Sequence, residues 1–299
     1  MTIRSTRTVV LQGAVSVAAL VVSTLAVSVG AAHSVQSGAP PSPAALAQFD
    51  FRAPPADRWA LPKGLQEISG LAVDSAGRVF AHGDEEAVVY QLEPGDHRVV
   101  KRFSFGRPAV RGDFEAIALV DGRIVLSTSD GVLYSGREGE DGESVPFTVQ
   151  RTGAGRFCEI EGMAHVLRDR ALLLACKEPR VRALRGHFAV LRWSLEHKAL
   201  DARPYIFIRL GDLTSQLKAQ GFHASELVRL SGAERYLVLA SREHAIAELS
   251  ATGEVLAVAH LRPRDHPQAE GLALSPDGTL LVADEGGTGR GTLSVYRPR

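Results

Sequence analysis

The sequence predicts an all-β fold, a β-propeller with five blades of four antiparallel strands. A glutamate recurs at the head of a short apolar segment at intervals of 44 to 65 residues, and a second acid follows each one 15 to 17 residues later. Short strands separated by turns with Asp-Gly or Ala-Gly fill each interval. Four strands in about 45 residues is the size of a propeller blade. The five repeated glutamates are Glu67, Glu115, Glu161, Glu226 and Glu270.

The N-terminal region predicts export. Arg4 and Arg7 precede an apolar run over residues 8–32, which ends in small residues and contains no acid. We interpret residues 1–33 as a secretory signal peptide or as an uncleaved anchor in the inner membrane, attached through residues 8–32. In both cases the rest of the chain lies outside the cytoplasm, in the periplasm or cell envelope. Residues 34–48 are rich in Pro, Ser and Gly and read as a flexible linker before a propeller domain over residues 49–299.

The first and last repeats show how the predicted ring closes. The first unit contains four strands, at residues 68–73, 78–82, 88–92 and 97–103. The last unit contains three strands before the chain ends, at residues 271–274, 279–283 and 292–296. We expect residues 57–61 to supply the missing outer strand and close the ring, which removes open sheet edges. A short helix near residues 212–219 fills the one long interval, and a degenerate sixth blade in residues 180–222 is the alternative.

The composition is that of a soluble globular protein, with 45% hydrophobic and 23% charged residues. Lys+Arg and Asp+Glu balance at 34 each, and no basic cluster with interleaved aromatic residues occurs, so we expect no nucleic-acid partner. Only five of the basic residues are lysines, which is typical of a GC-rich bacterial genome. The sequence contains no Gly-x-Ser-x-Gly, His-Glu-x-x-His or Cys-x-x-Cys pattern, so no esterase or zinc motif supports an activity.

The chain has two cysteines, Cys158 and Cys176. In an exported protein such a pair predicts a disulfide. The two residues fall roughly opposite one another across an antiparallel hairpin that turns near residues 167–170. Two buried free thiols are the alternative.

The repeated acids predict a polar site on the propeller axis. The first strand of each blade lines the central channel, so the five glutamates converge there, and carboxylates this close require a cation among them. Calcium accepts six to eight oxygen ligands in flexible geometry and is the cofactor that we expect at these five residues. Candidates for the rim of the channel are Asp84, Asp130, Lys177, Glu178, Arg242, Glu243 and Glu285. Two alternatives stay open: the acids accept hydrogen bonds from backbone amides of neighbouring blades, or two of them act as an acid–base pair.

Several of these segments resemble the SdiA-regulated (YjiK-like) family. The resemblance rests on the stretches Phe157–Ala164, Leu174–Pro179, Leu237–Val255 and Pro267–Ala273, and on Val282–Glu285, and it extends over residues 67–296. It implies an N-terminal hydrophobic segment, a β-propeller and calcium binding. One departure is Leu227 after Glu226, where the other units carry a smaller residue nearby, so the fourth blade is expected to present its acid differently.

Together these features predict an exported envelope propeller that binds calcium in an acid-lined channel and acts as a binding or scaffold module. Its partner would be a small ligand or another envelope protein. The alternative is a metal-dependent hydrolase of the lactonase or phytase type, in which the metal activates water.

Overall fold

The computed structural model describes residues 43–299, which form one compact unit. The predicted signal or anchor over residues 1–33 and most of the predicted linker lie outside the described residues. Within residues 43–299 no helix is long and apolar enough to cross a membrane. The last part of the predicted linker is folded, since Ala45–Gln48 form the short 3₁₀ helix η1 and Leu46 is buried.

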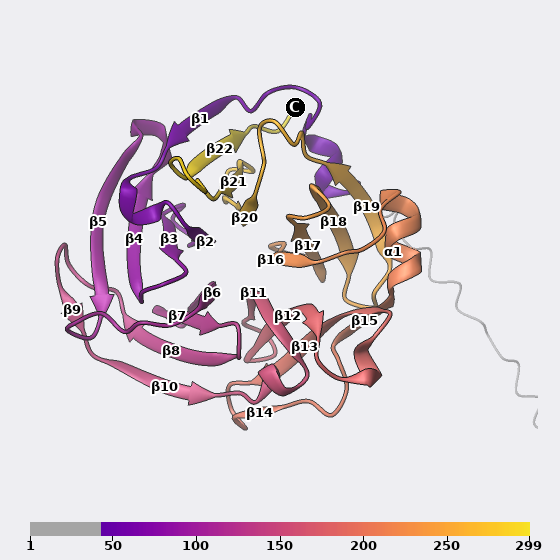
Figure 1. Cartoon of the computed structure of the whole chain (residues 1–299), viewed down its shortest axis with the longest axis horizontal. Helices are drawn as coiled ribbons and strands as arrows, with labels where there is room; N and C mark the ends of the chain where they lie inside the picture. Colours follow the sequence, from indigo (N-terminus) through magenta and orange to yellow (C-terminus); the bar gives the residue numbers. More distant parts are fainter. Residues whose placement is uncertain (1–42) are drawn as a thin grey trace, which may run out of the picture. The chain divides into compact units, whose positions relative to one another are not determined.

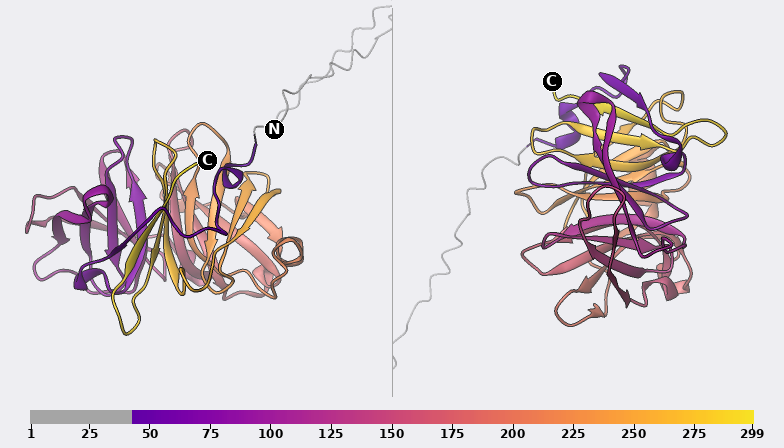
Figure 2. Two further views of the ribbon diagram at one scale, coloured as in Figure 1. Left: turned by 90° about the horizontal axis from the view of Figure 1, so that it is seen from above. Right: turned by 90° about the vertical axis from the view of Figure 1, so that its left-hand side faces the viewer.

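Five sheets stand around a central axis as the blades of a propeller (Figure 1). Figure 2 shows the ring from two sides, with the strands of each sheet crossing its thickness. Each sheet presents its first strand to the axis, and each of these inner strands lies beside the inner strands of the two neighbouring blades. The inner strands are β2 (Ile68–Val73), β6 (Phe114–Val120), β11 (Cys158–Val166), β16 (Ala224–Arg229) and β20 (Ala269–Leu274).

The remaining strands complete the five blades, three of which have the predicted four strands and two of which have five. Blade 1 adds β3 (Val79–Gly83), β4 (Val88–Glu93), β5 (Arg98–Phe105) and β9 (Ser144–Val145). Blade 2 adds β7 (Arg123–Thr128), β8 (Val132–Arg137) and β10 (Phe147–Arg151). Blade 3 adds β12 (Ala171–Pro179), β13 (His187–Ser194), β14 (Ala199–Leu200) and β15 (Ile206–Arg209). Blade 4 adds β17 (Arg235–Ala240), β18 (Ala245–Ser250) and β19 (Val255–His260). Blade 5 adds β21 (Leu280–Asp284), β22 (Thr292–Tyr296) and β1 (Asp57–Ala60).

The core consists of five clusters of buried apolar side chains, and each cluster lies between two neighbouring blades. Alternate side chains of a strand point to opposite faces of its sheet, so every blade contributes to two clusters. The helix α1 (Leu210–Leu217) follows β15 and buries Leu213 and Leu217 in the cluster between blades 3 and 4. The helix accounts for the long interval before the fourth repeat, as predicted, and residues 180–222 do not form a sixth blade.

Each inner strand contains an irregularity in its register with the second strand, at the same position in all five blades. In β20, for example, Ala269 pairs with Asp284 and Gly271 pairs with Ala283, so Glu270 is an extra residue. Such a β-bulge bends the strand and turns the extra side chain in a new direction. The five bulges therefore direct one side chain per blade.

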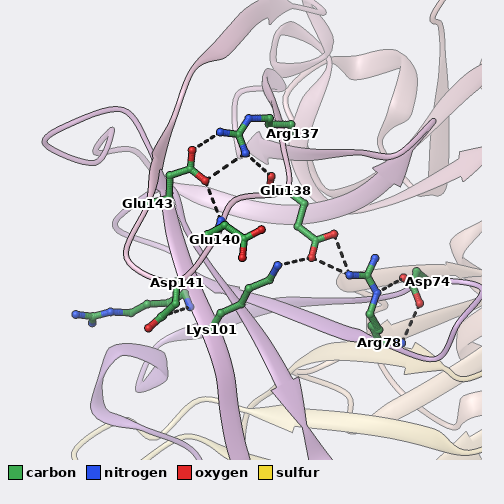
Figure 3. A network of polar contacts seen from close by, with 9 residues as sticks. Asp74, Arg78, Lys101, Arg137, Glu138, Glu140, Asp141 and Glu143 are labelled. Carbon is green, nitrogen blue, oxygen red and sulfur yellow. Dashed lines mark hydrogen bonds and ion pairs between the residues drawn. The ribbon is translucent and has the colours of Figure 1, made fainter.

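Blades 1 and 2 are linked because one segment of blade 2 contributes a strand to the sheet of blade 1. The segment after β8 leaves blade 2 and adds β9 to blade 1 by parallel pairing with β5, then returns to blade 2 as β10. Figure 3 shows the polar network that holds this segment. Glu138 accepts hydrogen bonds from Arg78 at 2.7 Å and pairs with Lys101 at 2.6 Å, and Arg137 pairs with Glu143. This network joins two blades away from the axis.

The predicted disulfide joins Cys158 and Cys176, whose Cα atoms are 5.5 Å apart. Cys176 lies opposite Ile160 rather than opposite Cys158, because the register of β11 and β12 shifts at this point. The bond therefore crosses the inner hairpin of blade 3 diagonally, directly before Glu161.

Candidate functional site

The five bulges bring their side chains to the channel, but only three of them carry a carboxylate. The register of the strands makes the bulge residues Ser69, Glu115, Glu161, Ser225 and Glu270. The expectation that a glutamate occupies the same point in every blade is thus wrong for two of them. Glu67 precedes β2 by one residue and is exposed, and Glu226 follows the bulge by one residue and is buried. Hydroxyl groups stand at the bulges of blades 1 and 4.

The bulge residues form one cluster around the ammonium group of Lys177. Lys177 lies on β12 and donates to Glu161 Oε1. Ser69 donates to Glu115 Oε2 at 2.7 Å and so links blades 1 and 2. We call Glu115, Glu161, Glu270 and Lys177 the channel cluster. The hydroxyls of Ser225 and Ser241 lie near its third carboxyl, Glu270, and act to lower the pKa of this group, while Ser225 itself donates to the Ala269 carbonyl at 3.1 Å.

Burial dominates the electrostatics of the channel cluster. It raises the pKa of Glu115 to about 8 and, together with the charge of Glu115, raises the pKa of Glu161 to about 9. The pKa of Glu270 is also raised, chiefly by burial. Burial opposes the charge of Lys177, but the three surrounding carboxyls outweigh it and raise the pKa of the lysine. Since one ammonium cannot balance three carboxylates in a desolvated site, the cluster retains protons at neutral pH.

Glu226 is held deeper in the channel by backbone amides. Its Oε2 accepts from the amide of Leu71 in blade 1 at 3.2 Å, and its Oε1 accepts from its neighbour Leu227 at 3.0 Å. The amide of Met163 in blade 3 faces this carboxyl closely enough to lower its pKa. Burial raises the pKa of Glu226 well above its usual range, and these three amides act against the rise. This residue therefore cross-links the inner strands of three blades, as in the alternative that repeated acids bind neighbouring amides.

At the end of the channel where the inner strands begin, blades 1 and 5 present a group of acids that we call the carboxylate mouth: Glu67, Asp84 and Glu285. Burial raises the pKa of Glu285 to about 7, and the charges of Glu270, Asp84 and Glu67 add to this effect. The pKa of Asp84 is raised by burial and by Glu67. No salt bridge to any of the three occurs among the described residues. Gln268 donates to Glu285 and is uncharged.

Each of the other predicted rim residues is paired with an oppositely charged or hydrogen-bonding side chain outside the channel cluster. Asp130 bonds to Arg180 at 2.5 Å, and Glu178 pairs with Arg242 at 2.7 Å. Glu243 accepts from the ring of His223 at 2.7 Å and from the His223 amide. The side chain of Arg242 is 54% exposed, so of the two basic residues among the predicted rim candidates only Lys177 lies in the channel.

The carboxylates of the channel differ in how well they suit calcium. Carboxylate oxygens are the correct donors, and the carboxylate mouth lacks a cation of its own. However, within residues 43–299 no three His, Cys, Asp or Glu side chains lie close enough together to hold a metal ion as they stand. In the channel cluster the place of a cation is taken by Lys177. Of the two groups, only the carboxylate mouth is without a basic side chain among the described residues, and the exposed Glu67 would need to turn toward Asp84 and Glu285 before the three carboxylates could hold a cation.

The fold and this channel define the class of protein: a five-bladed β-propeller with an acid-lined axis. No protein-family model matches the chain, and no curated protein is significantly similar in sequence. Among solved structures, glutaminyl cyclase from Myxococcus xanthus is similar, with a TM-score of 0.55 and 15% identity over 81% of this chain and 94% of that chain. The PQQ-bound aldose sugar dehydrogenase from Streptomyces coelicolor has a TM-score of 0.48 and 15% identity, covering 81% of this chain and 100% of that chain. Both are β-propellers. At this identity the likeness shows the fold alone.

Sequence reasoning missed the three serines of the site and the common bulge. The signal was present, since Gly70-Leu71-Ala72 and Gly271-Leu272-Ala273 align Ser69 with Glu270. The alignment of Glu67 with Glu270 placed the first repeat two residues out of register, because Ser69 is the residue that corresponds to Glu270.

Proposed function

We propose that the chain is an exported β-propeller of the cell envelope that binds a divalent cation, calcium, at the carboxylate mouth and serves as a binding or scaffold module. The observation that carries the proposal is the group of Glu67, Asp84 and Glu285, in which two carboxyls have a raised pKa and no basic side chain among residues 43–299 balances the charge. A bound cation would stabilise the ionised form of all three.

Membership of the SdiA-regulated family and the location in the envelope belong to the same proposal. The motif segments around Glu161 and Glu270 support the family, and the disulfide supports an oxidising compartment. The basic and apolar residues 1–33 support export, either as a cleaved signal or as an inner-membrane anchor.

Thermal unfolding in chelator and in excess calcium tests the cation site. A ligand that binds only the folded state at about 100 times its Kd stabilises it by about 2.7 kcal/mol, so calcium should raise the Tm. Glu285→Gln and Asp84→Asn should remove most of this rise. Glu196→Gln, which changes an exposed acid in a blade 3 turn, is the matched control and should retain it. An identical Tm in chelator and in calcium would contradict the proposal.

A metal-dependent hydrolase is the second candidate. The observation in its favour is the pair of Glu115 and Glu161, whose carboxyls keep a proton near neutral pH and are suited to acid catalysis. Hydrolysis assays with lactones and phosphoesters test this candidate. A peptide with N-terminal glutamine is added to the panel because of the name of the Myxococcus protein. Activity that is lost in Glu115→Gln and Glu161→Gln supports the enzyme, and activity that survives both changes removes these residues from its mechanism.

A further inference from the structure

The opposite end of the channel, where the inner strands end, differs in chemistry from the carboxylate mouth. It contains a cavity of about 220 Å³ lined by late residues of all five inner strands and by Ser231. These are Leu71–Val73, Ile117–Leu119, Met163–His165, Leu227–Arg229 and Leu272–Leu274. Arg229 and His165 are the only ionisable side chains in this lining, and no carboxylate belongs to it. We call this end the arginine mouth.

The backbone at the arginine mouth presents N–H groups to the axis. The amides of Leu71 and Leu227 donate to the carboxyl of Glu226, and the amide of Met163 faces the same carboxyl and lowers its pKa, so all three point away from the second strands of their blades. Backbone direction repeats every two residues along a strand, and the register of all three strands is regular beyond this point. The next amides that point to the axis are those of Val73, His165 and Arg229. Glu226 shows that one such set of amides holds a carboxylate.

Arg229 places a positive charge at the arginine mouth, and one N–H group of its guanidinium has no hydrogen-bond acceptor among residues 43–299. Its Nε is buried and has no acceptor among residues 43–299. Its nearest ionic partner, Glu234, lies 3.6 Å from Nη2, beyond hydrogen-bond distance. A buried donor without an acceptor is costly, so an acceptor from outside the chain would be favourable here.

Arg229 carries the main charge at the arginine mouth, because the other polar groups there are neutral or lie outside the cavity lining. Burial lowers the pKa of the His165 imidazole, with Arg229 acting in the same direction and Asp121 and the backbone of Leu119 acting against it. The ring is therefore neutral at neutral pH. Glu234 and Asp121 lie outside the cavity lining.

We propose that the arginine mouth binds a small carboxylate anion, through the guanidinium of Arg229 and the backbone amides of Val73, His165 and Arg229. The cavity, of about 220 Å³, has room for a compact monocarboxylate. The two ends of the channel then select ligands of opposite charge. This site is separate from the proposed cation site and does not depend on it.

Acetate is the probe, and its binding is measured on the purified protein by the Tm shift and by NMR of ¹³C-labelled acetate. Acetate should raise the Tm of the wild type and broaden the labelled resonance. Arg229→Gln should abolish both effects, and Arg229→Lys should weaken binding several-fold, because an ammonium cannot reproduce the fork of a guanidinium. Arg98→Gln, on the outer part of blade 1, is the matched arginine control and should bind as the wild type does.

Glu285→Gln separates the two proposals, since it should lose the response to calcium and keep the response to acetate. Equal acetate responses in the wild type and in Arg229→Gln would overturn the inference, as would the absence of any response in the wild type at hundreds of millimolar acetate. A response to inorganic phosphate without one to acetate would overturn the carboxylate assignment. If Arg229→Gln does not fold, the comparison of the wild type with Arg229→Lys decides, and equal affinities would contradict a role for the guanidinium.

Discussion

Glu115 and Glu161 keep protons at a pH where exposed glutamates have lost them, because burial in the channel disfavours their charge. Lys177 balances the negative charge of one carboxylate of the channel cluster. The other two carboxyls are neutralised only by a proton or by a second cation. A single internal lysine thus keeps a buried acidic cluster compatible with the folded state.

Stability should therefore fall as the pH rises. Between the usual glutamate pKa of 4.5 and the folded values of about 8 and about 9, the native protein binds more protons than the unfolded chain. The stabilisation is complete below the unfolded pKa and is lost as the pH rises through the folded pKa. We expect a loss of about 1.4 kcal/mol per carboxyl for each pH unit between about pH 5 and the folded pKa, measured by urea unfolding. Glu115→Gln should flatten this slope and Glu196→Gln should not; an unchanged slope in Glu115→Gln would contradict the assignment.

At the scale of the element, the β-bulge in each inner strand is the feature that directs one side chain per blade into the channel. The blade count, the inner strands and the disulfide could be predicted from the sequence, because apolar segments, turn residues and spacing determine them. The register could not, since a bulge adds one residue without changing the apolar pattern. For this reason Glu226, which has the spacing of the other glutamates, binds amides, whereas Ser225 stands at the bulge. Asp130 pairs with Arg180, and Glu243 pairs with His223. These contacts depend on the conformation of loops, which the interval between repeats in the sequence does not determine.

Gly162 shows how tightly a bulge is packed. Its φ is +94°, and a Cβ at this position would lie 2.6 Å from the amide nitrogen of Leu227 and 2.8 Å from the carbonyl carbon of Glu226. Gly162→Ala should therefore destabilise the protein by roughly 2–4 kcal/mol, as measured by urea unfolding, because backbone strain and overpacking act together. Gly186→Ala is the control, since its φ of +75° is also positive but nothing lies within 4 Å of the added Cβ. This variant should lose only about 1 kcal/mol, and equal losses in the two variants would show that packing at the bulge is unimportant.

At the scale of the whole molecule, both ends of residues 43–299 are held on blades 4 and 5. β1 pairs with β22 over four residues, and the Arg299 amide donates to the Gln48 carbonyl at 2.9 Å. The amide of Leu46 donates to the buried Glu248 of blade 4 at 3.1 Å, and Glu248 pairs with Arg235 at 2.8 Å. Phe49 and Phe51 are buried in the cluster between these blades. The segment before β2 is thus part of the propeller core.

Two N-terminal truncations test this role. A chain that begins at Pro43 keeps the compact unit and should unfold at the same urea concentration as the full chain. A chain that begins at Leu61 lacks β1 and three buried side chains, Leu46, Phe49 and Phe51, each of which contributes about 1.5–3 kcal/mol. The loss of roughly 5 kcal/mol or more is comparable to the whole stability of a domain. Because the edge of β22 is then unpaired, the shorter chain should unfold or self-associate in size-exclusion chromatography. A monomeric, equally stable chain from Leu61 would show that the propeller does not need β1.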